Sequence, residues 1–170
     1  FTESAQRMGV PYHSDFDFTN QMTITLWMYG LAPDSDKNQA RLVAKKTYPP
    51  DYALNVRTST KDVRTQTGWG GDMVTGGGVW ADGAWYHVAL VYDYSGAGTG
   101  TIYVNGDPEA TTTISNPIST GNNEVVIGAA PDNSYATAYA FYGYMDDVRF
   151  YNTALTEAEV NAVMTPPEIP

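Results

Sequence analysis

Carboxylates, histidines and thiols most often carry out chemistry in proteins, and this chain offers few of them in useful arrangements. It has no cysteine, which excludes a disulfide framework, a thiolate metal site and a cysteine nucleophile. Its one Glu-x-Glu pair, Glu157 and Glu159, follows Thr156 in a capping-box pattern, where both acids suit the positive end of a helix dipole. The pair therefore predicts the start of a short helix, ending at about Met164, rather than an acid and a base for catalysis.

The two histidines, His13 and His87, are the only ones available for a zinc site or a Ser-His-Asp triad. His87 lies within a strand-like run, residues 85–93, so we expect it to pack and form hydrogen bonds. His13 is assigned no role. We therefore predict that the chain is not an enzyme.

Asp146 is the sharpest chemical feature of the sequence. In a strand over residues 144–151 it shares a face with Val148 and Phe150, so one carboxylate is predicted to point toward the core. Burying it without a partner costs several kcal/mol. Asp146 must therefore meet a cation, meet several N–H donors, or lie at a bulge that turns it outward.

Aromatic rings are the next candidates, because 4 tryptophans, 13 tyrosines and 5 phenylalanines are more than one core needs. Sugars bind to flat apolar faces together with planar polar groups. Trp27 and Trp85 are predicted to lie in the core, whereas Trp69, flanked by glycines, is the preferred sugar platform. The other candidate sugar-binding residues lie in or beside loops and are Tyr48, Tyr52, Tyr135, Tyr139, Arg57 and Arg64.

The elements that must position these residues are predominantly strands. Short runs rich in threonine, tyrosine and valine alternate with clusters of glycine, asparagine, aspartate, serine and proline. Residues 23–29 alternate as a half-buried strand does, and residues 85–93 are apolar on both faces, as in a central strand covered on each side. Asn105-Gly106 predicts a type I′ hairpin turn.

Four segments, residues 22–28, 83–93, 102–106 and 143–156, resemble in order and spacing the laminin-G-like, concanavalin A-like lectin and glucanase family of jelly-roll domains. The resemblance implies an all-β, two-sheet antiparallel β-sandwich with one short C-terminal helix. We expect residues 1–165 to form this domain and residues 166–170 to begin a proline-rich linker.

Laminin-G-like domains often carry a structural Ca²⁺ near the sheet rim, so the resemblance implies Asp146 as a ligand, with Asp15 and Asp17 as further ligands. Ca²⁺ also suits the oxygen-rich, cysteine-free composition. The alternative is a metal-free aspartate that is hydrogen-bonded or paired with arginine.

Charge and hydropathy limit the partners. The formal net charge of −10 disfavours nucleic acid, and no apolar run reaches the ~20 residues of a membrane helix. We expect an extracellular, non-catalytic, polysaccharide-binding module joined to flanking domains of a larger secreted or cell-surface protein. The alternative is a structural or adhesion domain with no sugar ligand.

Overall fold

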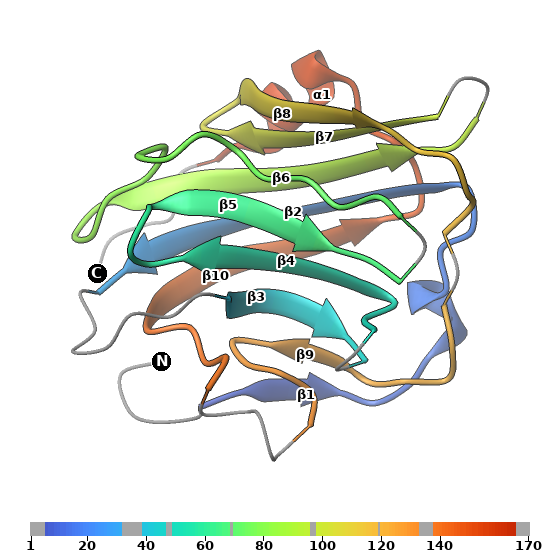
Figure 1. The fold of residues 1–170 in the computed structure, drawn as a ribbon, viewed down its shortest axis with the longest axis horizontal. Helices are drawn as coiled ribbons and strands as arrows, with labels where there is room; N and C mark the ends of the chain where they lie inside the picture. Colours follow the sequence, from blue (N-terminus) through green and yellow to red (C-terminus); the bar gives the residue numbers. More distant parts are fainter. Residues whose placement is uncertain are drawn as a thin grey trace.

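In the computed structural model, the described part of the chain forms two antiparallel sheets of five strands each, packed face to face (Figure 1). Sheet A has the strand order β1-β9-β3-β4-β5, and sheet B has the order β10-β2-β6-β7-β8. The predicted all-β sandwich is confirmed. The structure describes residues 6–31, 39–46, 49–68, 70–95, 98–118, 120–132 and 138–165.

Both sheets combine strands from distant parts of the sequence. Sheet A consists of β1 (Met8–Val10), β9 (Val125–Ile127), β3 (Ala40–Lys45), β4 (Tyr52–Arg57) and β5 (Asp62–Gln66). Sheet B consists of β10 (Gly143–Tyr151), β2 (Gln21–Gly30), β6 (Trp85–Asp93), β7 (Thr99–Val104) and β8 (Asp107–Thr113). A 3-10 helix, η1 (Ser14–Phe16), precedes β2, and α1 (Glu157–Val163) follows β10.

Strand β2 shows how the alternation of residue types builds the core. Ile24, Leu26 and Met28 are fully buried between the sheets, in the same cluster as residues of β4 and β6. Thr23 and Thr25 lie on the opposite, outer face of sheet B. The predicted half-buried strand is present, but its outer face is also covered, because both threonines are buried as well.

Helix α1 covers part of that outer face. Val160 packs against Ala89 and Val91 of β6, so β6 is apolar on both sides, as predicted. The capping box is also confirmed, because the Thr156 hydroxyl accepts from the Glu159 N–H and the Glu159 carboxylate accepts from the Thr156 N–H.

The hairpin turn was predicted from the sequence, whereas the first strand was not. Asn105 and Gly106 have φ values of 51° and 88° and join β7 to β8, as the predicted hairpin turn requires. The short strand β1 pairs with β9, far away in sequence, and so adds an edge strand that local pattern did not predict.

The glycine-rich segment after β5 packs against the sandwich. Residues 73–75 run antiparallel to β5, with N–H···O distances of 3.0 Å from Thr65 to Met73 and 2.9 Å from Thr75 to Val63. The Trp80 side chain is 2% exposed and donates to the Asp62 carbonyl (3.2 Å). The described residues include no helix that is long and apolar enough to cross a membrane. The predicted linker at 166–170 lies outside them.

Candidate functional site

A row of polar side chains crosses the outer face of sheet A. Arg41 on β3 lies directly opposite Asn55 on β4, which lies directly opposite Arg64 on β5. The Arg41 guanidinium donates from Nη1 to Asn55 Oδ1 (2.8 Å) and from Nη2 to Gln66 Oε1 (3.0 Å). Leu54, next to Asn55, points into the core. Alternation along β4 therefore places the planar polar groups on the face away from the core.

Arg41 is buried without a neutralising carboxylate. It is 2% exposed, and its hydrogen-bond acceptors are two neutral amides. Among the described residues, no carboxylate forms an ion pair with it. Burial lowers the pKa of Arg41 to about 10, so the side chain is still a cation at neutral pH. The ring centroid of Tyr139 lies 5.4 Å from the guanidinium carbon, which is a cation–π contact.

Two buried donor groups in this row have no acceptor within the described part of the chain. They are Nε of Arg41 and Nδ2 of Asn55. A buried donor without an acceptor costs about 1–3 kcal/mol. Both groups are covered, so oxygens of a ligand would bond to them only after the side chains above them move aside.

Arg57 and Arg64 hold the carboxylate of Asp62 at the β5 end of the row. Arg57 Nε donates to Oδ2 and Arg64 Nε donates to Oδ1, each at 3.0 Å. The Thr60 hydroxyl also donates to Oδ2. The Asp62 side chain is 3% exposed, whereas those of Arg57 and Arg64 are 29% and 20% exposed. Asp62 therefore fixes two partly exposed guanidinium groups beside Arg41 and Asn55.

The structure places three of the predicted sugar-binding residues on this face. Arg57 and Arg64 flank Asp62, and Tyr139 lies against Arg41. Tyr52 does not agree with its prediction: it is fully buried on the inward side of β4, so its ring has no face open to a sugar. The remaining three predicted residues, Tyr48, Trp69 and Tyr135, lie outside the described residues.

Sequence reasoning missed the centre of the row, which is formed by Arg41, Asn55 and Gln66. One signal was present, because Arg41 is the only charged residue within the apolar run 40–44. A single arginine within an apolar strand indicates either that one face of the strand is polar or that the arginine is a buried charge. Asn55 and Gln66 gave no comparable signal, since their position depends on the register of three strands.

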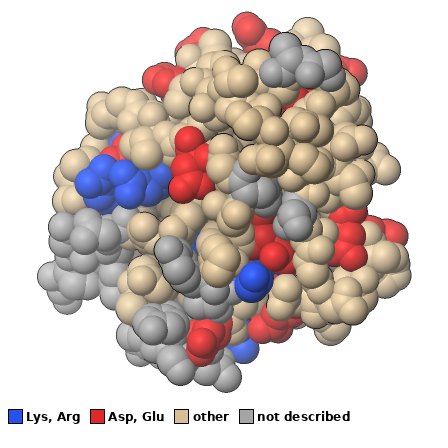
Figure 2. Space-filling view, turned by 45° about the vertical axis from the view of Figure 1, so that its right-hand side comes forward, with Lys and Arg blue, Asp and Glu red and all other residues tan. Residues whose placement is uncertain are grey.

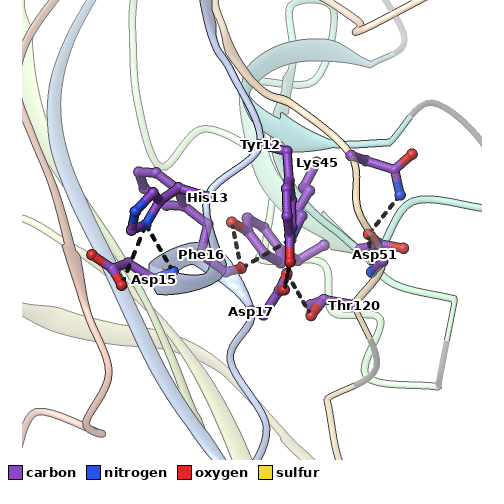
Figure 3. A network of polar contacts seen from close by, with 11 residues as sticks. Tyr12, His13, Asp15, Phe16, Asp17, Lys45, Asp51 and Thr120 are labelled. Carbon is purple, nitrogen blue, oxygen red and sulfur yellow. Dashed lines mark hydrogen bonds and ion pairs between the residues drawn. The ribbon is translucent and has the colours of Figure 1, made fainter.

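A second polar network ties the N-terminal segment to β3 (Figure 3). The fully buried Lys45 ammonium donates to the Asp17 carboxylate and to the Phe16 carbonyl (3.3 Å). Tyr12 Oη (2.9 Å) and Thr120 Oγ1 (3.1 Å) donate to the same carboxylate. Burial raises the pKa of Asp17, but the three hydrogen bonds and the Lys45 charge outweigh it, so this pKa lies below its usual value.

Asp146 faces the solvent, contrary to the orientation predicted from strict alternation. It lies opposite Trp27, and the register with β2 shifts directly after it, where Asp147 has a left-handed φ of 52°. This bulge keeps Val148 and Phe150 against the core while Asp146 Oδ1 accepts from the Asp147 N–H (2.7 Å). The predicted inward carboxylate is therefore wrong, and a bulge turns it outward.

The three carboxylates predicted to hold Ca²⁺ do not share one site. Asp146 is exposed on the outer face of sheet B, Asp17 is bonded to Lys45, and Asp15 lies 3.3 Å from His13 Nδ1. Within the described ranges, no three His, Asp or Glu side chains are close enough to hold a metal ion. Calcium binding by any one of these carboxylates stays a prediction.

Comparison with known proteins agrees with this fold. A model of the concanavalin A-like lectin/glucanases superfamily matches residues 3–161. Among curated protein sequences, none matches the chain.

Three solved structures illustrate the likeness. A SAP-like pentraxin from Limulus polyphemus is 19% identical, with a TM-score of 0.68 over 94% of this chain and 81% of that chain. Domain 4 of an extracellular arabinanase from Geobacillus stearothermophilus, in complex with arabinotriose, is 21% identical, with a TM-score of 0.62 over 96% of this chain and 75% of that chain. A protein from Bacteroides ovatus, described as carbohydrate-binding, is 19% identical, with a TM-score of 0.67 over 94% and 47%.

Proposed function

The chain belongs to the concanavalin A-like lectin/glucanases superfamily, and from this membership we propose that it is a non-catalytic, glycan-binding module of a larger secreted or cell-surface protein. The similar arabinanase domain was solved with arabinotriose, and the similar Bacteroides ovatus protein is described as carbohydrate-binding. Both support a glycan as the ligand. Binding alone, without a chemical step, is then the whole mechanism.

The observation that carries the proposal is the row formed by Arg41, Asn55 and Arg64. Sugar hydroxyls are acceptors as well as donors, so they suit the partly exposed guanidinium of Arg64 and, once the atoms that cover them move aside, the donor groups of Arg41 and Asn55. Tyr139 adds a half-buried ring beside them. Planar polar groups beside an aromatic ring are the composition expected of a sugar site.

The state of Asp62 supports binding without catalysis. A retaining glycosidase uses two carboxyl groups, one of which must exchange a proton with the substrate. Asp62, the carboxylate nearest the row, accepts hydrogen bonds from Arg57, Arg64 and Thr60. Its oxygens are thus committed to positioning two guanidinium groups.

The test is native gel electrophoresis through gels that contain neutral arabinan, neutral xylan or anionic polygalacturonate. We expect at least one polysaccharide to retard the protein, and Arg64→Ala to weaken that retardation. Arg149→Ala is the matched control, because Arg149 pairs with an aspartate two residues earlier in the same manner, but on sheet B.

Each outcome discriminates between the alternatives. Weaker retardation for Arg64→Ala, but not for Arg149→Ala, supports a glycan site on sheet A. If no polysaccharide from a broad panel retards the wild-type domain, the glycan proposal is wrong. A structural or adhesion domain, whose aromatic residues pack against neighbouring modules, then becomes the better description.

A further inference from the structure

Three aromatic residues form a continuous strip on the outer face of sheet B. Tyr144 on β10 lies directly opposite Tyr29 on β2, and Tyr29 lies directly opposite Trp85 on β6. The ring centroids are 5.8 Å apart for the first pair and 5.6 Å for the second. The rings thus contact one another across three neighbouring strands, and we call them the aromatic strip.

The strip is accessible from solvent. Tyr144 is 47% exposed, and Tyr29 and Trp85 are half-buried. This differs from the sequence prediction that Trp85 lies in the core. On the same outer face, the Trp27 indole N–H donates to the carbonyl of Thr165, the last described residue after α1 (2.7 Å).

One carboxylate, that of Asp146, borders the strip. Asp146 is exposed and lies on the same outer face as Tyr144, because the bulge at Asp147 turns it away from the core. Aromatic rings on which a sugar can stack therefore lie beside carboxylate oxygens that can accept from its hydroxyl groups.

We propose that the aromatic strip is a binding surface for a neutral polysaccharide, separate from the site on sheet A. Strands in a sheet lie about 4.8 Å apart, which is close to the length of one sugar unit. A sugar chain that crosses β10, β2 and β6 would therefore meet one ring on each strand. The C–H faces of its sugars stack on the rings, and its hydroxyls donate to Asp146.

Charge favours a neutral rather than an anionic glycan. Asp146 lies beside the strip, and the chain carries a net charge of −10. Figure 2 shows another side of the molecule, on which acidic side chains also outnumber basic ones, as the net charge requires. Uronic acid or sialic acid carboxylates would be repelled near Asp146.

The composition of the strip also favours a sugar over a protein partner. Apolar side chains on this outer face, Ala89 and Val91, are already covered by Val160 of α1. The strip itself consists only of aromatic rings, two of which carry hydroxyl groups. The inference shares the ligand class with the proposed function but rests on different residues, on the opposite face of the sandwich.

The experiment uses the same arabinan, xylan and polygalacturonate gels with Tyr144→Ala and Trp85→Ala. Loss of a central aromatic anchor is expected to weaken binding to a neutral polysaccharide about tenfold. Tyr144→Phe keeps the ring and should bind as the wild type does. Tyr12→Ala is the matched control, because Tyr12 is 42% exposed and lies outside the strip. Thermal melting verifies that each variant is folded.

The outcomes separate this inference from the proposed function. A tenfold loss in both strip variants, with Tyr144→Phe and Tyr12→Ala unchanged, supports the strip. Retardation that depends on Arg64 but not on Tyr144 or Trp85 overturns the strip and leaves the site on sheet A in place. Retardation by polygalacturonate alone also overturns it, because the strip is predicted to bind neutral chains.

Discussion

The buried ammonium of Lys45 donates to the carboxylate of Asp17 and so joins the end of β3 to the segment that contains η1. The same segment reaches sheet B, because Phe16 packs edge-on against Phe150 of β10, with ring centroids 5.1 Å apart. One short stretch of chain thus contacts both sheets, and its ion pair supplies internally the charge that a bound cation would otherwise provide.

Removing the ammonium should destabilise the domain. Lys45→Met keeps the length of the buried side chain but leaves Asp17 without its counter-charge. We expect a loss of about 2 kcal/mol, below the roughly 3–5 kcal/mol of a fully buried pair, because the Asp17 side chain is 26% exposed. Urea unfolding measures the change. The double variant Lys45→Met/Asp17→Asn should recover part of the loss, and purely additive effects would contradict a direct coupling.

Chelation provides a second test of the same region. If Lys45 alone balances Asp17, EDTA should leave the melting temperature unchanged. If Ca²⁺ binds only to the folded chain, saturating calcium should raise the melting temperature. The free energy of unfolding would then increase by about 2.7 kcal/mol at a hundredfold excess of calcium over Kd. A calcium-dependent rise that Asp146→Ala or Asp15→Ala abolishes would restore the calcium prediction and identify its ligand.

His87 should make stability depend on pH. Burial lowers its pKa from 6.5 to about 4. Between these values the unfolded chain binds a proton that the folded chain does not, so stability is complete above pH 6.5 and falls as the pH is lowered toward 4. The full effect is about 3 kcal/mol. Melting curves from pH 4 to 7 should show a shallower slope for His87→Asn, with His13→Asn as the exposed control. Equal slopes for the wild type and His87→Asn would exclude this account.

Arg41 should contribute to glycan affinity but little to the stability of the fold. Arg41→Met removes a buried cation whose side-chain hydrogen bonds go to neutral amides, so we expect the free energy of unfolding to stay within about 1 kcal/mol of the wild type. The affinity for whichever polysaccharide depends on Arg64 should fall about tenfold. Thermal melting and affinity gels give both values. A variant that unfolds would show that Arg41 is needed for the fold, and one that binds normally would show that Arg41 does not contribute to glycan binding.

Patterns within short segments of the sequence predicted those elements whose own residues determine their structure. The alternation in β2, the doubly apolar run of β6, the Asn105-Gly106 turn and the capping box at Thr156 each act within a few residues. They were therefore visible without knowledge of the fold. Strand β1 was not, because three residues pair only with β9, far away in the sequence.

The candidate sites were harder to predict for the same reason. Asp146 was predicted to face inward because strict alternation takes no account of the left-handed residue at Asp147. The row on sheet A and the aromatic strip each need the register of three strands, which no single segment contains. Trp85 was predicted as core from its strand position, although the position lies beyond the part of the outer face that α1 covers.

The strand order also constrains how the chain is made. Strand β2 lies between β6 and β10, and both β1 and β3 pair with β9, so neither sheet is complete until residues beyond 125 have been synthesised. While the ribosome extends the chain from its N-terminal end, β2 and β3 each have one side without a partner strand. Such unpaired edges join readily to other chains. Productive folding therefore depends on keeping nascent chains apart until β9 and β10 have been synthesised.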